Sequence, residues 1–97
     1  RDSMIQRFEF TYELGWKCMF YWLREQGENV LEMQRPILQA AFRCELIHDP
    51  KVWEEIKEQR DETSHTYNEA KAVSVAAFIR SHALAEFDAL RVKFNSL

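Results

Sequence analysis

The chain has 97 residues, of which 46% are hydrophobic and 13% aromatic, so it is expected to form one folded domain with a modest core rather than a disordered segment. With only 2 glycines and 2 prolines it lacks the turn residues of a fold with many short strands, which favours long helices. The net charge is −3, and no block of like charge occurs. The composition therefore does not support non-specific electrostatic binding of nucleic acid, but it is compatible with a local basic site.

The first predicted helix covers residues 3–26. Ser3 and Gln6 have the spacing of a capping box, and Gly27 is placed to end the helix. Apolar residues recur along one face at helical spacing: Ile5, Phe8, Tyr12, Trp16, Met19 and Leu23. A second, narrower stripe consists of Phe10, Leu14 and Tyr21. Two apolar sides are typical of a helix in the middle of a bundle, where the second stripe is either core or a surface on which another helix docks.

Two shorter helices are predicted in the middle of the chain. Residues 28–35 have the pattern of a loop, and Pro36 suits the first turn of a helix. The apolar face of that helix is formed by Leu38, Ala41, Phe42 and Leu46. Asp49 followed by Pro50 is a strong signal for the start of a third helix, which is expected to end near Arg60. Its inner face consists of Val52, Trp53 and Ile56.

A last helix is predicted from about Thr66, which forms a second capping box with Glu69, to about Phe94. Its inner face repeats at helical spacing: Ala72, Ala76, Ile79, Ala83, Phe87, Leu90 and Phe94. At 1.5 Å per residue this is roughly 40 Å of unbroken helix. The fold class predicted from these segments is an all-α, antiparallel up-and-down bundle of the four-helix type, with a single domain over residues 1–97.

The location is predicted to be cytoplasmic. No secretory signal and no apolar run of membrane-spanning length occurs in the sequence, so no membrane partner is expected. Cys18 and Cys44 have no metal-ligand spacing and are interpreted as small apolar positions in a reducing compartment.

The stretch RDETSHTYNE, residues 60–69, lies between the last two predicted helices and contains Arg60, His65 and Tyr67. On one unbroken helix, residues five apart point about 140° apart, so these side chains would diverge. A break in the helix lets a corner aim all three at one place. The N-terminus of the following helix favours a phosphate and a neutral imidazole, which can act as a general base. Arg60 can hold a phosphate with its planar guanidinium.

RNA is the substrate for which this set of groups can suffice. The 2′-hydroxyl of RNA is an internal nucleophile, so a histidine and an arginine can cleave the chain without a metal ion. Cleavage needs one group that removes a proton and another that donates one, and a single histidine does not readily serve as both. A two-fold dimer would bring a second copy of His65 into the same cleft and so supply the second group.

A purely structural interpretation of the same stretch stays open. Thr66 and Glu69 can simply cap a helix, and His65 can donate to a backbone carbonyl group. Arg60 can pair with one of the carboxylates that follow it, Asp61 or Glu62.

Three other polar features are interpreted without a function. Glu9, Glu13 and Lys17 follow one another at four-residue spacing, which is typical of a solvated, salt-bridged helix face. No histidine lies at ligand spacing beside these carboxylates, so no metal site is predicted. His48 and His82 are predicted to be solvated surface residues.

Two segments together resemble a known family. RDSMIQRFEFTYELGWK, residues 1–17, and RDETSHTYNE, residues 60–69, are similar to the signatures of the nucleotidyltransferase substrate-binding proteins, which belong to the HEPN superfamily of small helical bundles. The segment AAFRCELIHDPKVWEEIKEQR, residues 40–60, fits the same layout, so the resemblance covers essentially the whole chain.

The resemblance implies a partner and an activity. Such proteins are one half of a bacterial or archaeal two-gene module, often a toxin–antitoxin pair, whose other half is a separate minimal nucleotidyltransferase chain that uses ATP and a metal. It implies a homodimer whose Arg-x4-His motif, here Arg60 and His65, is a ribonuclease site that needs no metal or other cofactor. In some members the partner transfers AMP to a tyrosine, here Tyr67, and silences the nuclease.

The sequence departs from the family pattern in two places. The family usually has another helix before the segment that starts at Arg1, so the sequence is expected to be a fragment or to have the gap filled by a second copy. The residue after the motif arginine is usually Asn and is Asp61 here, a carboxylate expected to weaken phosphate binding by Arg60.

Three hypotheses follow. The preferred one is a non-catalytic or substrate-presenting subunit that pairs with the minimal nucleotidyltransferase and presents Tyr67, or a bound substrate, to it. The alternative is a metal-independent ribonuclease toxin that uses Arg60 and His65, is silenced by AMP transfer to Tyr67, and acts on RNA. In both, supporting roles are predicted for Asp61, Thr66 and Glu69. The third is a bundle with only a structural use.

Overall fold

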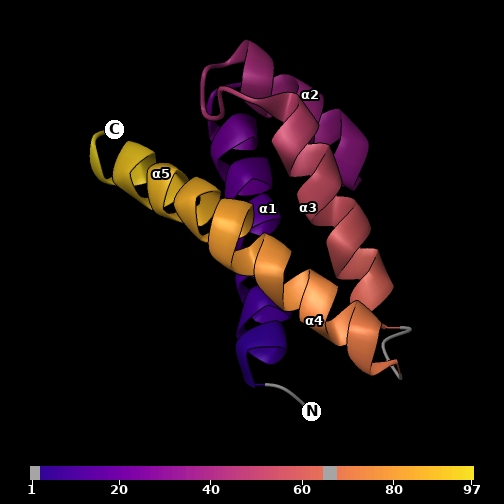
Figure 1. Cartoon of the computed structure of the whole chain (residues 1–97). Helices are drawn as coiled ribbons and strands as arrows, with labels where there is room; N and C mark the ends of the chain where they lie inside the picture. The colour runs from indigo at the N-terminus through magenta and orange to yellow at the C-terminus, as the bar shows by residue number, and fades with distance from the viewer. Residues whose placement is uncertain (1–2, 65–67) are drawn as a thin grey trace.

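The computed structural model describes residues 3–64 and 68–97, and within these ranges every regular element is helical. The elements are α1 (Ser3–Glu25), α2 (Gln34–Arg43), α3 (Pro50–Thr63), α4 (Glu69–Phe78), the π-helical segment η1 (Ile79–Ala83) and α5 (Leu84–Asn95). α1 and α3 run antiparallel, and α4 and α5 cross α1 (Figure 1). The predicted all-α bundle is confirmed.

α1 is the central helix, because it contacts α2, α3, α4 and α5. The predicted inner face of α1 is confirmed: Ile5, Phe8, Tyr12, Met19 and Leu23 are buried, and Trp16 packs half-buried against them. The second stripe lies outside the core, since Phe10, Leu14 and Tyr21 are 70%, 52% and 57% exposed. Its interpretation as core is therefore wrong, whereas its use as a docking surface stays a prediction.

Two residues beyond the end of each of α1 and α2 lies a residue with left-handed backbone. Gly27 has φ 87° and Glu45 has φ 64°. In each case the next residue donates its N–H back across the last turn, from Glu28 to the Leu23 carbonyl and from Leu46 to the Ala41 carbonyl. This six-to-one bond is the Schellman arrangement, which satisfies carbonyl groups that the end of a helix leaves open.

The left-handed turn at Glu45 changes which residues of this segment are buried. Leu46 is 3% exposed, but it reaches the core from the connection after α2, not from the helix face that was predicted. Phe42, which was predicted to lie on that face, is 48% exposed. The buried side of α2 is instead formed by Ile37, Leu38, Ala40 and Ala41. The error at Leu46 arises because a helix period was continued through Glu45, which leaves the helix, whereas Phe42 lies within α2 but not on its buried side.

The start of α3 was predicted correctly. Asp49 is the N-cap with extended backbone, and its carboxylate accepts hydrogen bonds from the backbone N–H groups of Lys51 and Val52 at 3.1 and 3.3 Å. Pro50 occupies the first helical position, where a backbone N–H would have no helical acceptor. α3 continues three residues beyond the predicted end, to Thr63.

Replacement of Asp49 by alanine is expected to lower the free energy of unfolding by about 1 kcal/mol, because two backbone donors lose their acceptor. Urea unfolding followed by circular dichroism measures this change. Asp49→Asn is the matched control and should stay within a few tenths of a kcal/mol of the wild type. An asparagine variant as unstable as the alanine variant would show that the charge of Asp49, and not its hydrogen bonds, stabilises α3.

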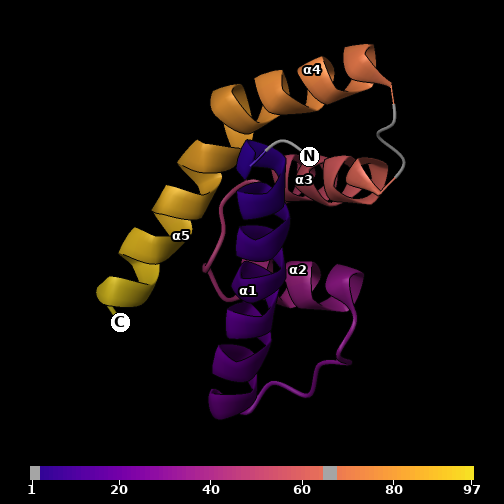
Figure 2. The same ribbon diagram turned by 90° about the horizontal axis from the view of Figure 1, so that it is seen from below.

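The last predicted helix is confirmed as helical but not as straight. η1 interrupts it between α4 and α5, and the two α-helices meet there at an angle (Figure 2). Within η1 the Ser81 hydroxyl donates to the Ala77 carbonyl oxygen at 2.8 Å, an acceptor that the α-helical ladder would otherwise use. Such side-chain competition and π-turns are recognised causes of helix bends.

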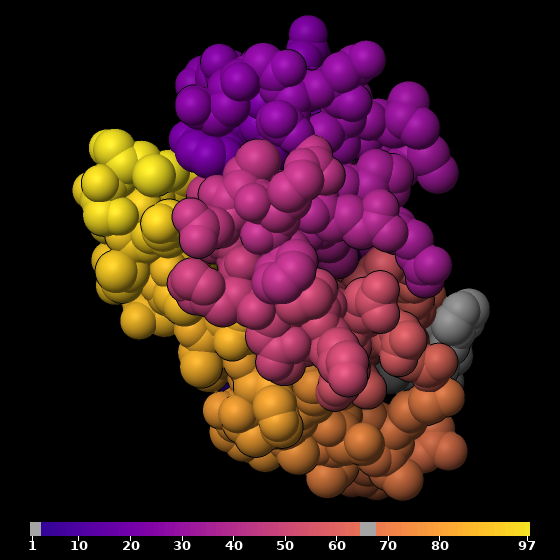
Figure 3. All heavy atoms as spheres, turned by 90° about the horizontal axis from the view of Figure 1, so that it is seen from above, coloured from indigo at the N-terminus to yellow at the C-terminus, as the bar shows by residue number. Residues whose placement is uncertain are grey.

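The bend lets both halves of this segment reach the core. Val75 and Ala76 of α4, Ile79 and Ala83 of η1 and Leu90 of α5 are buried. Seen from above, the magenta and pink residues of the middle of the chain cover the centre of the molecule, the yellow C-terminal end of α5 lies at the left edge, and the orange residues of α4 and η1 lie at the bottom (Figure 3).

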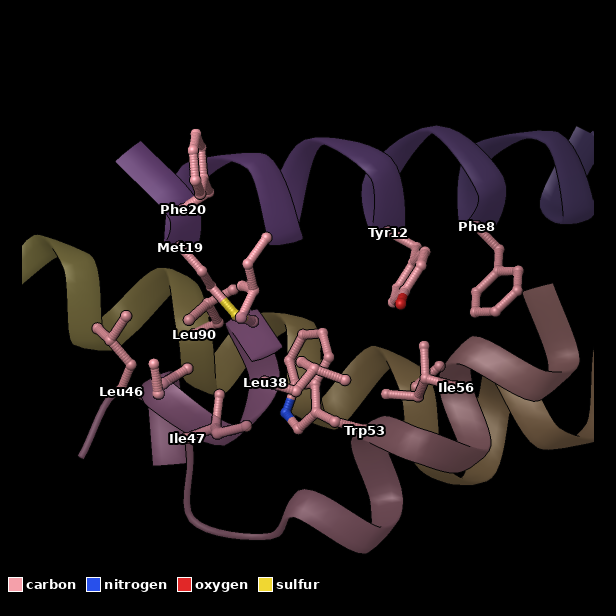
Figure 4. Packing of buried hydrophobic residues seen from close by; sticks show 14 of the residues in the cluster. Phe8, Tyr12, Met19, Phe20, Leu38, Leu46, Ile47, Trp53, Ile56 and Leu90 are labelled. Atoms are coloured by element: carbon pink, nitrogen blue, oxygen red, sulfur yellow. The ribbon is translucent and has the colours of Figure 1, made fainter. Parts of the chain in front are cut away.

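The core is centred on Trp53. Its ring lies with its centroid 6.4 Å from that of Tyr12 and 5.8 Å from that of Phe87, so it connects α3 to α1 and α5. Figure 4 shows Phe8 and Tyr12 pointing from α1 toward Trp53 and Ile56. Because Trp53 and Ile56 are fully buried, the relative position of α1 and α3 is set by large side chains.

Candidate functional site

Arg60 lies in the last turn of α3, as predicted, at the end of the helix nearest the start of α4. His65, Thr66 and Tyr67 lie outside the described residues, so their predicted roles stay predictions. The described part of the site consists of the end of α3, the part of α1 beside it and the start of α4.

Two carboxylates of α1 surround the guanidinium of Arg60. Its Nε lies 3.3 Å from Glu13 Oε1, and its Nη1 lies 3.7 Å from Glu9 Oε2. The Arg60 and Glu9 side chains are only 26% and 18% exposed, so water screens this cluster less than an ion pair on the open surface. Nε is itself buried without an aligned hydrogen bond in the described part of the chain, and its 3.3 Å approach to Glu13 is an ion-pair contact.

Thr63 joins the same cluster. It is the one polar residue among the described residues that is buried, at 1% exposure, and its hydroxyl oxygen lies 2.6 Å from both Glu9 Oε2 and the Arg60 carbonyl oxygen. A hydroxyl has one proton, so Thr63 donates to one of these acceptors at a time. Arg60 Nη1 lies 3.4 Å from the same oxygen. The end of α3 is therefore joined to α1 by hydrogen bonding and by charge.

The interpretation of Glu9 and Glu13 as part of a solvated, salt-bridged face is wrong. The two residues are half-buried, and their ion pairs are made with an arginine of another helix; Glu13 also accepts a hydrogen bond from the Trp16 indole N–H on α1 at 3.1 Å. Lys17, the third residue of the predicted face, is exposed and lies over the Trp16 ring. One signal in the sequence pointed to this arrangement: Glu9 follows Phe8 and Glu13 follows Tyr12, which places both carboxylates at the border of the buried face.

The carboxylates that follow Arg60 in the sequence do not form its ion pairs. Asp61 pairs with Lys57 at 3.0 Å on the exposed side of α3, and Glu62 pairs with Lys71 of α4 at 2.5 Å. The structural interpretation in which Arg60 pairs with Asp61 or Glu62 is therefore wrong. The neutralising charge expected from Asp61 comes instead from Glu9 and Glu13.

The start of α4 differs from the prediction. Its N-cap is Asn68, whose side-chain oxygen accepts from the N–H groups of Ala70 and Lys71 at 2.8 and 3.3 Å. Because Asn68 has extended backbone, α4 begins at Glu69, three residues later than the predicted start near Thr66, which itself lies outside the described residues. Glu69 is exposed in the first helical turn, where a carboxylate interacts favourably with the helix dipole.

The other histidines agree with the sequence prediction, since His48 and His82 are both exposed. Both cysteines are free thiols. Within residues 3–64 and 68–97, no group of three histidine, cysteine or acidic side chains is placed to hold a metal ion. None of the helices described is long and apolar enough to cross a membrane.

Tyr12 is the residue before Glu13 on α1 and is fully buried. Its hydroxyl donates to Gln34 Oε1 of α2 at 2.6 Å. Burial, together with the negative charges of Glu13 and Asp61, raises the pKa of the Tyr12 phenol above its ordinary value. The folded state therefore favours the protonated phenol.

This shift predicts a loss of stability at alkaline pH. The contribution of Tyr12 is complete below the pKa of an unfolded tyrosine, about 10, and is lost as the pH rises above that value, by at most about 1.4 kcal/mol per pH unit. Urea unfolding between pH 8 and pH 11 measures the decline. Tyr12→Phe, which cannot ionise, should start about 1 kcal/mol lower at pH 8 but decline less steeply. Parallel declines of the two proteins would contradict the prediction.

A family of known proteins matches the part of the chain that contains the residues just described. The model of one family, "Nucleotidyltransferase substrate binding protein like", matches residues 1–96, a range that contains Glu9, Glu13, Arg60 and the stretch 60–69. The chain belongs to this family. The family resemblance inferred from the sequence is thereby confirmed.

A similar protein is the "Probable ribonuclease HepT" of Haemophilus influenzae (strain ATCC 51907 / DSM 11121 / KW20 / Rd). It is 39% identical to this family member over 79 residues, which cover 77% of this chain and 54% of the relative. The chain thus spans about half the length of this relative.

Proposed function

We propose that this chain is a ribonuclease that uses Arg60 and His65 and needs no metal ion. The observation that carries the proposal is the half-buried guanidinium of Arg60, held at the end of α3 five residues before His65 in the sequence. An arginine held in this way can meet a phosphate group without first losing much side-chain freedom. The name of the similar protein, a probable ribonuclease, supports the same reaction class.

The proposed reaction is an internal transfer at phosphorus. His65 takes the proton of a 2′-hydroxyl group, the 2′-oxygen forms a bond to phosphorus, and the bond from phosphorus to the 5′-oxygen breaks. Arg60 stabilises the negative charge that grows on the phosphate oxygens. The 5′-oxygen leaves with a proton, which the second His65 of a homodimer would supply. The products are a 2′,3′-cyclic phosphate and a 5′-hydroxyl group.

The proposed reaction needs a 2′-hydroxyl group and no metal ion, and both requirements can be tested. A mixed RNA pool is incubated with the protein in excess EDTA, and the products are separated by size and examined for 2′,3′-cyclic phosphate ends. RNA should be cleaved, whereas an oligonucleotide of the same sequence with 2′-O-methyl groups should stay intact, because it has no internal nucleophile. Cleavage of both, or of neither by a folded protein, would reject the proposal.

A second function is favoured by a different observation. The family description names a nucleotidyltransferase, and α1 exposes the stripe of Phe10, Leu14 and Tyr21. We propose that the chain is also the partner subunit of a separate minimal nucleotidyltransferase, in a toxin–antitoxin-like module of the prokaryotic cytoplasm. In this role Tyr67 receives AMP and the nuclease is silenced.

Co-expression tests the partner role independently of cleavage. A short nucleotidyltransferase reading frame beside this one is the candidate partner, and the two chains should elute together from a sizing column. Phe10→Ser and Leu14→Ser should separate them if the exposed stripe forms the interface. Two chains that elute separately would reject the partner role and leave the ribonuclease proposal standing.

A further inference from the structure

Two carboxylates four residues apart on α1 meet the same arginine of α3, and the proposed reaction gives neither of them a role. The contacts that Arg60 makes with described residues use its Nε and Nη1 atoms; Nη2 takes part in none of them. We propose that Glu13, with Glu9, is a positioning residue: it fixes the guanidinium of Arg60 so that the Nη2 edge meets the scissile phosphate. This inference rests on the proposed ribonuclease function.

The physical basis is the freedom of an arginine side chain. An unrestrained arginine has about 2 kcal/mol of rotamer entropy to lose when it binds, and its planar fork is useful only in the correct orientation. Glu13 and Glu9 sit on a helix that is fixed to the core through Phe8 and Tyr12, so their carboxylates form a rigid support. The ion-pair contacts at Nε, 3.3 Å, and at Nη1, 3.7 Å, attract the guanidinium toward α1 and so restrict its orientation.

The two carboxylates also have an effect that would slow cleavage, because their negative charge repels the phosphate of the substrate. Together with Arg60 they have a net charge of −1, from two negative charges and one positive, which opposes the approach of a phosphate. If this repulsion outweighed the positioning, removal of one carboxylate would speed up cleavage. If positioning dominates, the same removal slows cleavage. The sign of the change therefore decides between the two effects.

Glu13 is the better residue for the test, because its other hydrogen bond is accepted from the Trp16 indole N–H on α1 itself, at 3.1 Å, whereas Glu9 accepts from Thr63 and its loss would disturb the end of α3. Glu13→Gln keeps the shape and an acceptor oxygen but removes the charge, and Glu13→Leu removes both. We expect kcat to fall by roughly 10-fold in the first variant and roughly 100-fold in the second, with a smaller change in KM. Glu25→Gln removes the same charge at an exposed position on the same helix and is the control, with kcat unchanged.

A spectroscopic measurement separates positioning from a general loss of stability. In the ¹⁵N-labelled wild type the Nε–H signal of Arg60, identified by its absence in Arg60→Lys, should be dispersed and slow to exchange with water. In Glu13→Gln it should move toward the average arginine signal while the backbone amide spectrum stays folded. Glu13→Asp, which keeps the charge but is shorter, is expected to lie between the two and serves if Glu13→Gln does not fold.

The outcomes for the two proposals are distinct. A wild-type protein that cleaves RNA, together with Glu13 variants that cleave equally fast or faster, would overturn the positioning role and leave the ribonuclease intact. A wild type that cleaves no RNA would reject the ribonuclease and the positioning role with it. Slower cleavage with an altered Arg60 signal would support both.

Discussion

Replacement of His65 by alanine is expected to lower the rate of RNA cleavage by about 100-fold to 10,000-fold, the range that a general acid–base group contributes. The proposed mechanism needs the imidazole to take the proton from the 2′-hydroxyl group. If a homodimer supplies the acid from its second copy, the same substitution removes both groups. The measurement is the initial rate of cleavage in EDTA at equal concentrations of folded protein.

Tyr67→Phe is the matched control, because it lies two residues from His65 in the sequence and keeps the aromatic ring. It should cleave RNA at the wild-type rate, and it should not accept AMP from the partner enzyme. A His65→Ala protein that cleaves as fast as Tyr67→Phe would remove His65 from the mechanism. AMP transfer to Tyr67→Phe would place the modification on another residue.

The second large effect is expected in the core. Trp53→Ala should lower the free energy of unfolding by about 3–5 kcal/mol, which is a substantial part of the stability of a small domain. Trp53 is fully buried, and its ring packs against those of Tyr12 and Phe87, so its loss leaves a cavity between α1, α3 and α5. Urea unfolding followed by circular dichroism at 222 nm measures the change.

Trp53→Phe is the control for this prediction. The indole Nε1 is buried without a hydrogen-bond partner among the residues of the structure described, so a phenyl ring loses volume but no hydrogen bond to those residues. The phenylalanine variant should therefore be less than half as destabilised as the alanine variant. Equal destabilisation of both would mean that the indole N–H, through a water molecule, contributes more than the ring packing.

Local signals accounted for the helix starts and ends that were predicted correctly. Asp49 and Pro50 predicted the start of α3, and Gly27 predicted the end of α1, because capping is decided by side chains within a few residues. The inner face of α1 followed from its apolar period in the same way. The last helix starts later than predicted because Asn68, a residue type that also caps helices well, is the N-cap of α4.

Other features depended on contacts between distant segments. Thr63 and Glu9 are separated by 54 positions in the sequence, and their hydrogen bond exists only because α1 and α3 pack side by side. Glu9 and Glu13 are four residues apart, a spacing that occurs both on solvated helix faces and where two carboxylates pair with a half-buried arginine of another helix. The spacing alone therefore does not distinguish the two arrangements. The bend at η1 was likewise hidden, because an apolar repeat looks the same along a straight helix and a bent one.

The sequence by itself determined the helical class of this protein, its family signatures and the position of Arg60 near the end of a helix, because these depend on composition, period and short motifs. Only the tertiary structure decided what surrounds Arg60. The charges nearest to it in the sequence, Asp61 and Glu62, point to Lys57 and Lys71, while Glu9 and Glu13 reach it from another helix. The reason is that the partner of a half-buried charge is chosen by the packing of helices, which brings together residues that no local spacing connects.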